Sequence, residues 1–229
     1  KVNRNCDTSI STKYPVASDE EYNKAKKSKT FDHSDWDKLM KSYVSPGQVD
    51  GITTNVVDYQ ALSKDPKFES YCNSLQTVDL SSLHPNEQLA LYINAYNAFC
   101  IGHVLRYYET NKELPKSVNN AGDGNTEVWD LEAGIVGGET VSLDDIENKI
   151  LRSRWSEPRV HASIVCASAS CPNLRREAFV ASKLNEQMDD HARQWMTNPT
   201  KGLAVDVKAK VATFSRIFLW YKSDFSQAG

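Results

Sequence analysis

The sequence PNEQLALYINAYNAFCIGHVLRYYE, residues 85–109, decides the fold of this chain. Pro85 suits the first position of a helix, and the helical pattern continues through the whole stretch. From residue 89 to residue 101, only Asn94 and Asn97 are strongly polar. A helix that is apolar on nearly all sides is covered by the rest of the fold, so we expect a central buried helix here.

The segments around this helix predict an α+β fold that is mostly helical, with the central buried helix packed on a small antiparallel sheet. Residues 1–30 are polar and are expected to form an N-terminal arm, whereas residues 31–229 contain no linker or repeat and are expected to form a single α+β domain. Apolar runs and turn residues predict strands at 128–131, 135–141, 159–166, 203–207 and 210–214, and helices at 34–44, within 58–75, at 143–152 and at 172–198, with a closing turn or helix at 215–225.

The composition argues against several classes of partner. The 229 residues carry a formal net charge of −3, so neither nucleic acid nor an anionic membrane is expected as a partner. No apolar run approaches the ~18 residues that cross a bilayer, so no membrane insertion is expected. The histidines show no zinc-ligand spacing and no glycine-rich phosphate loop occurs, so we expect no metal and no cofactor. The expected partner is an unidentified small molecule or protein.

The cysteines indicate an oxidising compartment. Five cysteines without metal-ligand spacing are typical of disulfides. The sequence begins at Lys1 without an apolar leader, which is expected of a secreted or extracytoplasmic protein after its signal peptide has been removed. Cys6 lies in the polar arm and Cys72 near the end of a short helix, and we predict that they pair. Cys100 lies among apolar residues and is expected in the core.

The segment HASIVCASASCP, residues 161–172, is the richest in candidate catalytic groups. Cys171 comes directly before the helix predicted from Pro172, where the helix dipole and unpaired backbone N–H groups favour a thiolate. A cysteine nucleophile needs that form of the thiol. Alternatively, a Cys166–Cys171 disulfide closes a small ring and stiffens the turn. The spacing leaves both alternatives open.

His161, Glu87 and Asn94 are the other candidate catalytic residues. Side chains alternate along a strand, so His161 and Cys166 are expected on opposite faces, and Cys171 is the better placed thiol. Glu87 and Asn94 lie two turns apart on one stripe of the central helix, where buried polar groups must be hydrogen-bonded. The predicted cleft lies where this helix meets the segment of His161. The alternative is that these residues are structural. His161 is then a buried neutral histidine, Glu87 interacts favourably with the helix dipole, and Asn94 hydrogen-bonds a neighbouring loop.

Four blocks of sequence carry a family resemblance: EQLALYINAYNA (87–98), SLDDIENKILR (142–152), HASIVCASASCP (161–172) and FLWYKSDF (218–225). Together they resemble the domain-of-unknown-function family 547, in order and over about residues 31–226. The implied architecture is similar to papain-like and transglutaminase-like folds, in which a nucleophilic cysteine starts the central helix and a histidine follows on a strand. Here Glu87 stands at the helix start, and Asn148 stands where the family usually carries histidine.

Two functions agree with these features. The first is an exported globular domain with a binding or structural role, in which Cys166 and Cys171 form a staple. The missing histidine at position 148 and the missing cysteine at the helix start favour it. The second is a hydrolase or an acyl- or thiol-transferase, with Cys171 as nucleophile or redox thiol, His161 as base, and Glu87 with Asn94 as the polar wall of the cleft.

Overall fold

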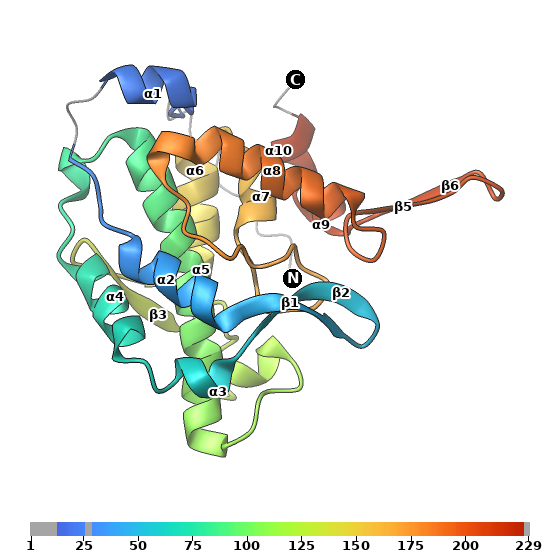
Figure 1. Ribbon diagram of the computed structural model, residues 1–229, viewed down its shortest axis with the longest axis horizontal. Coiled ribbons are helices and arrows are strands. Elements are labelled where there is room, and N and C mark those ends of the chain that lie inside the picture. Colours follow the sequence, from blue (N-terminus) through green and yellow to red (C-terminus); the bar gives the residue numbers. More distant parts are fainter. Residues whose placement is uncertain (1–12, 26–28, 227–229) are drawn as a thin grey trace.

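The computed structural model describes residues 13–25 and 29–226, and its centre is the long helix α5 (Pro85–Asn111) (Figure 1). The side chain of His84 caps this helix by accepting a hydrogen bond from the N–H of Asn86, and Lys112 ends it in a left-handed conformation. Every residue from 89 to 105 is buried. The prediction of a central buried helix is confirmed.

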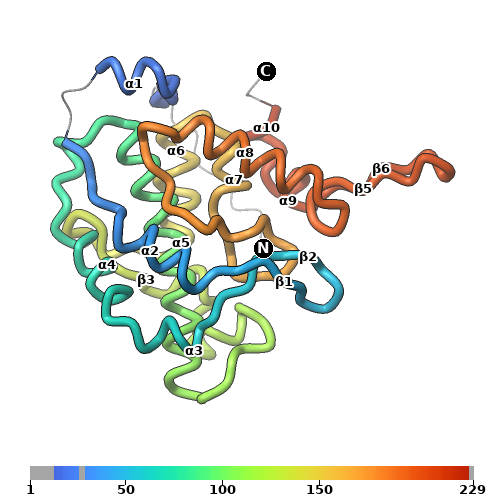
Figure 2. Tube along the Cα trace, viewed as in Figure 1, coloured from blue at the N-terminus to red at the C-terminus, as the bar shows by residue number. Residues whose placement is uncertain are grey.

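Shorter helices surround α5, and segments far apart in the sequence lie side by side on it (Figure 2). Amphipathic sequence explains the larger ones: α2 buries Trp36 and Leu39, and α8 buries Met188 and Trp195, while their other faces are polar. The helices are α1 (Asp19–Ala25), α2 (Ser34–Tyr43), α3 (Tyr59–Leu62), α4 (Pro66–Gln76), α6 (Arg152–Arg154), α7 (Val160–Ser163), α8 (Leu184–Thr197), α9 (Ile217–Trp220) and α10 (Lys222–Ser226), the π-helix η3 (Asp145–Leu151), and the 3-10 helices η1 (Leu80–Ser82), η2 (Val118–Ala121) and η4 (Ala181–Lys183).

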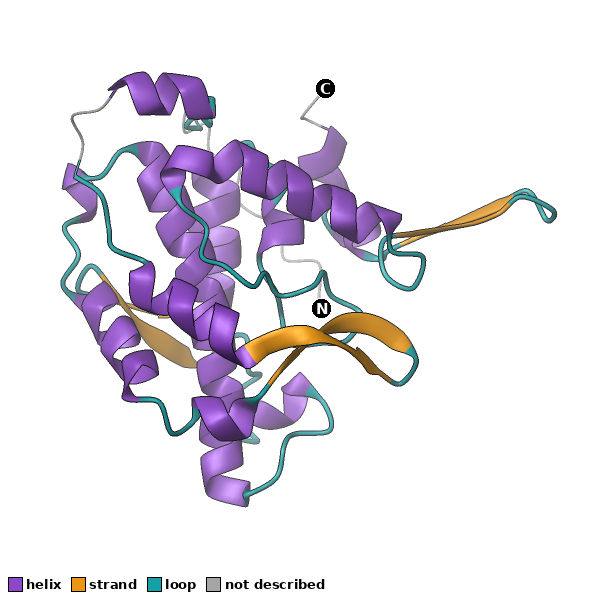
Figure 3. Ribbon diagram, viewed as in Figure 1, coloured by secondary structure: helices purple, strands orange, loops and turns teal. Residues whose placement is uncertain are grey.

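The strands of the described residues form separate two-stranded antiparallel sheets (Figure 3). β3 packs on α5, where Gly134 is required because a Cβ atom at that position would lie 2.4 Å from the ring of Phe99. The fold is α+β and mostly helical, as predicted, although hairpins take the place of one small sheet. The pairs are β1 (Val44–Val49) with β2 (Ile52–Val57), β3 (Glu132–Val136) with β4 (Glu139–Ser142), and β5 (Leu203–Asp206) with β6 (Val211–Phe214).

The β5–β6 hairpin extends away from the rest of the structure (Figure 1). Cross-strand partners share a face, so Leu203, Val205, Ala212 and Phe214 lie on the same side of the hairpin. Val205 is 61% exposed and Phe214 is 54% exposed. One face of this hairpin is therefore apolar and open to solvent.

Four predicted elements are wrong. The single strand predicted at 135–141 is two strands, because Gly137 and Gly138 form the turn between β3 and β4. Residues 159–166 are not a strand, because α7 occupies Val160–Ser163; a short apolar run does not distinguish a buried strand from a buried helix. The helix predicted at 172–198 begins only at Leu184. The strand predicted at 128–131 is a turn, in which the carbonyl of Glu127 accepts hydrogen bonds from two following N–H groups.

The described part of the predicted arm lies against the domain. The N–H of Tyr14 donates to the carbonyl of Arg154 at 2.7 Å, and Asn86 of α5 binds both the N–H and the carbonyl of Ala17. The division into an arm and one domain stays a prediction. Within the described ranges, no helix is both long and apolar enough to cross a membrane.

Candidate functional site

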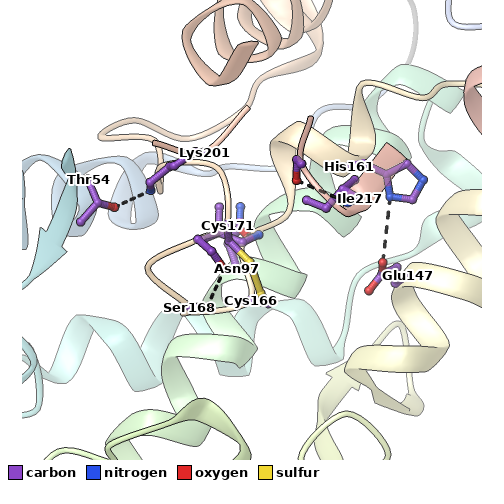
Figure 4. Close-up of a disulfide and its surroundings, with 12 residues drawn as sticks. Thr54, Asn97, Glu147, His161, Cys166, Ser168, Cys171, Lys201 and Ile217 are labelled. Atoms are coloured by element: carbon purple, nitrogen blue, oxygen red, sulfur yellow. Dashed lines mark hydrogen bonds and ion pairs between the residues drawn. A yellow bond between two sulfur atoms is a disulfide. The ribbon is translucent and has the colours of Figure 1, made fainter. Parts of the chain in front are cut away.

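A group of mostly buried polar side chains lies where η3, α7 and α10 meet, and Figure 4 shows two of them, His161 and Glu147. The Nε2 atom of His161 lies 2.8 Å from Oδ2 of Asp224, and its Nδ1 atom lies 4.0 Å from Oε1 of Glu147. Arg152 donates from Nε and Nη2 to the two carboxylate oxygens of Asp224 at 2.6 and 3.0 Å. We name these four side chains, together with Tyr96 and Tyr221, the His161 cluster.

The π-helix η3 sets the position of Glu147. Ser142 and Asp145 cap its start reciprocally, since each N–H donates to the other side chain, at 2.9 and 3.0 Å. The N–H of Arg152 then bonds to the carbonyl of Glu147, five residues back. Segments of π-helix occur often at functional sites. This one brings Glu147 and Arg152 to the same histidine.

Aromatic rings seal His161 from solvent. The ring of Tyr221 stacks on the imidazole with centroids 4.0 Å apart and planes inclined by 21°, and Phe225 lies 5.6 Å away. The guanidinium of Arg152 lies 4.8 Å from the centre of the Tyr221 ring on its face. Only 1% of the His161 side chain is exposed. The segment 221–225 therefore acts as a cover over His161.

The electrostatics of the cluster keep its charges paired. Burial alone would raise the pKa of Asp224, but the hydrogen bonds from His161 and Arg152 outweigh it and hold that pKa well below its usual value. Burial, with the charge of Glu147, raises the pKa of Tyr96 and Tyr221 well above the usual value. At neutral pH both tyrosines keep their protons, and the Tyr96 hydroxyl lies 3.4 Å from Glu147.

Cys171 is not placed as a nucleophile. Its sulfur lies 2.12 Å from that of Cys166, and the two residues form a disulfide. Because α8 begins at Leu184, Cys171 is also far in sequence from the start of a helix, and the argument for a dipole-stabilised thiolate does not apply.

The structure does not bring Glu87 and Asn94 to His161. Glu87 accepts hydrogen bonds from the hydroxyl of Tyr22 and from the N–H of Phe31. Asn94 donates to the carbonyl of Phe179 at 2.8 Å and accepts from the N–H of the same residue at 3.0 Å. Glu87 and Asn94 instead hold segments that pass over α5.

Asn97 uses its amide in the same way, on the segment that follows α7. It donates to the carbonyl of Ser163 at 3.0 Å and accepts from the N–H of Val165 at 2.8 Å. A carboxamide carries both a donor and an acceptor, as a peptide group does. An asparagine on a buried helix can therefore hydrogen-bond the backbone N–H and carbonyl groups of an irregular segment. This explains why Asn94 and Asn97 interrupt an apolar helix.

A cavity of about 380 Å³ opens beside the disulfide. Its walls come from η2, from the turn at 127–129, from the disulfide loop 166–171, and from Trp220 of α9. No residue of the His161 cluster lines it.

One protein family covers the segments that hold Tyr96, Glu147, Arg152 and His161. The family DUF547, described as a protein of unknown function, matches residues 80–196, which is more than half of the chain. The chain belongs to DUF547. The match is narrower than the resemblance over about residues 31–226, and it ends before Asp224. Searches of curated proteins and of solved structures found no match.

The four blocks of the DUF547 resemblance meet in the His161 cluster. The first contributes Tyr96, the second Glu147 and Arg152, the third His161, and the fourth Tyr221 with Asp224. Of the residues in this cluster, the sequence predicted only His161 as a site residue. No local signal marks the charged partners, because Glu147 and Arg152 lie in a block with several other charged residues and Asp224 lies close to Lys222.

In this DUF547 chain Asn148 hydrogen-bonds Arg152, a member of the His161 cluster. Its amide donates to Asp144 at 2.8 Å, and its carbonyl oxygen accepts from Nη1 of Arg152 at 2.7 Å. Asparagine at this position thus helps to aim Arg152 at Asp224.

In the described part of the chain, neither the other cysteines nor a group of potential metal-binding side chains forms a second candidate site. Cys6 lies outside the described residues, so its predicted pairing with Cys72 stays a prediction. Burial raises the pKa of the Cys72 thiol to about 12, and Cys100 is buried in α5. Among residues 13–25 and 29–226, no group of three or more His, Cys, Asp or Glu side chains could hold a metal ion.

Proposed function

We propose that this chain is a binding domain that works outside the cytoplasm, with a small molecule or a protein as its partner. The proposal rests on the contacts and the burial of the His161 side chain. One ring nitrogen is bonded to Asp224, the other faces Glu147, and 1% of the side chain is exposed. A general base needs a ring nitrogen within hydrogen-bonding reach of its substrate, and this arrangement leaves none.

The disulfide supports the proposed location. A disulfide persists in oxidising compartments and is rare in the cytosol. The Cys166–Cys171 bridge is therefore in keeping with a secreted or extracytoplasmic protein. It also removes the thiol that a cysteine-based mechanism needs.

Turnover assays test the proposal. Wild type and His161→Gln are incubated with chromogenic ester, amide and thioester substrates, and their melting temperatures are measured. We expect no turnover that depends on His161, and a lower melting temperature for His161→Gln. His84→Asn is the matched control, since asparagine also caps helices well. Turnover that is lost in a His161→Gln variant of unchanged melting temperature contradicts the proposal.

A second candidate is a hydrolase or acyl-transferase on a papain-like or transglutaminase-like scaffold. The buried carboxylate of Glu147, 4.0 Å from Nδ1 of His161 on a π-helix, favours it. In this case the cover 221–225 must lift to admit substrate. Asp224→Asn loosens that cover, so turnover of the same substrates rises if the second candidate is right and stays absent if the first is right.

A further inference from the structure

The cavity beside the disulfide has the size of a small-ligand pocket. Its volume of about 380 Å³ lies within the usual range of about 300–1,000 Å³ for such sites. It is formed by segments that are far apart in sequence, including η2 and α9. It is also separate from the His161 cluster, so a ligand there does not require the cover 221–225 to move.

Two tryptophans supply apolar surface to this cavity. Trp129 is half-buried, and Trp220 is 40% exposed. An indole offers a large flat face on which a ligand can pack at a small cost in conformational entropy. The cavity therefore favours a ligand with at least one apolar face.

The polar groups of the cavity are mostly neutral. Ser117, Asn119, Ser168 and Ser170 line it, and Glu127 is the one ionisable side chain among the lining residues besides the bridged cysteines. The carboxamide of Asn119 makes no hydrogen bond to another side chain or backbone group of the described residues. Among the described residues, no lysine, arginine or histidine lines the cavity, so an anionic ligand meets no opposite charge from this part of the chain.

The neutral groups are held in place by the local structure. Ser117 and Asn120 form a reciprocal cap on η2, which fixes the neighbouring Asn119. The hydroxyls of Ser168 and Ser170 lie 3.1 Å apart inside the disulfide loop. A ligand that uses these groups meets a site that is already organised.

We propose that this cavity binds a small uncharged polyhydroxylated ligand of the saccharide class. The inference rests on the proposed binding function and names the ligand of that function. A sugar ring presents apolar C–H faces to indole rings and a rim of hydroxyls to serine, asparagine and glutamate side chains. A quaternary ammonium group would use Trp220 and Glu127 but has no hydroxyl or N–H group to offer the amide of Asn119 or the serine hydroxyls.

Titration tests the ligand class directly. Wild type, with its disulfide intact, is titrated by calorimetry and by tryptophan fluorescence with neutral hexoses, N-acetylhexosamines and their disaccharides. Choline chloride and sodium phosphate are the counter-probes. Trp220→Ala and Asn119→Ala remove one apolar and one polar contact. Leu219→Ala and Asn125→Ala are the matched controls, because both residues are exposed neighbours that do not line the cavity.

We expect at least one saccharide to bind, with an affinity at least tenfold weaker in each cavity variant and within twofold of wild type in each control. If no saccharide binds, or if the cavity variants bind as wild type does, the inference is overturned. Choline or phosphate binding that depends on Trp220 overturns the ligand class and leaves the binding function standing. His161-dependent turnover overturns the binding function instead, so the two failures are distinguishable.

Discussion

His161 and Asp224 are joined by a contact of 2.8 Å between Nε2 and Oδ2, although 63 residues separate them in the sequence. The same carboxylate accepts two hydrogen bonds from Arg152. One side chain of α10 thus links α7 to the end of η3. The contact holds α10 over the His161 cluster and so attaches the end of the described chain to the rest of the fold.

Replacing Asp224 should destabilise the protein strongly. Asp224→Asn keeps the shape but removes the negative charge that His161 and Arg152 contact, which we expect to lower the free energy of unfolding by about 3 kcal/mol. Urea unfolding measures the change. Asp50→Asn, at an exposed turn, is the control and should stay within about 0.5 kcal/mol of wild type. A loss below about 1 kcal/mol for Asp224→Asn would mean that the pairs contribute little.

The pH dependence of the same variant gives a second measurement. The pKa of Asp224 is depressed in the folded state, so its contribution is fully present above the unfolded pKa of about 3.9 and is lost as the pH falls toward the folded value. Wild type should therefore lose stability below about pH 4 more steeply than Asp224→Asn. Parallel acid unfolding curves for the two proteins would contradict this.

Lys201 should make stability rise at alkaline pH. Its side chain is buried and, within the described residues, donates to the neutral acceptors Thr54 at 2.8 Å and Asn173 at 2.7 Å. Burial lowers its pKa to about 8. Between about pH 8 and the unfolded pKa of about 10.4, the unfolded chain binds more protons than the folded chain, so this group adds stability as the pH rises.

Lys201→Met removes that effect. From pH 7.5 to 9.5, we expect wild type to gain about 1–2 kcal/mol relative to Lys201→Met in chemical unfolding. Comparing the two proteins cancels the titration of other groups. Lys208→Met, at an exposed position of the β5–β6 hairpin, should follow wild type. A constant difference between wild type and Lys201→Met would show that the amine titrates normally.

The Cys166–Cys171 bridge should contribute modestly to stability because it closes a short loop. In the chain-entropy description, removing it with the double variant Cys166→Ser/Cys171→Ser costs about 2 kcal/mol. Reduction of wild type with dithiothreitol should reproduce the loss, and the double variant should not respond to the reductant. A reductant effect on the double variant would assign the loss to another bridge.

Asn94 should prove structural. In Asn94→Ala the N–H and carbonyl of Phe179 lose their partner inside the core, and a buried polar group without a partner costs about 1–3 kcal/mol. We expect a loss of about 2–4 kcal/mol in urea unfolding. Asn125→Ala, in an exposed loop, should change stability by less than about 0.5 kcal/mol. An unchanged melting temperature for Asn94→Ala would restore the interpretation of Asn94 as a cleft residue.

Local patterns predicted the parts of the fold that depend on local interactions. The nearly uniform apolarity of residues 89–101 identified α5, and the turn residues between apolar runs identified the β5–β6 hairpin. The segment at α7 was missed because Asn97 satisfies the backbone that follows it from another helix. A hydrogen bond across 66 residues leaves no trace in periodicity.

The candidate site was predicted only in part for the same reason. His161 could be singled out because a titratable group interrupted an apolar run. Its partners Glu147 and Asp224 come from segments that the sequence does not connect to it. Of the two alternatives for Cys171, the thiolate failed at one step, since the helix after Cys171 begins twelve residues later than Pro172 suggested. Without a helix terminus, a small-residue loop favours the bridge over the thiolate.

The position of Asp224 has a consequence for biosynthesis. At the usual ribosomal rate of about 5–20 residues per second, residue 224 is made about 3–13 seconds after residue 161. During that interval the nascent chain carries Arg152, Glu147 and His161 without the carboxylate and rings that later enclose them. The core around α5 therefore reaches its final packing only after its own synthesis is long complete, and a ribosome that stalls before α10 leaves a chain whose charged centre is still open.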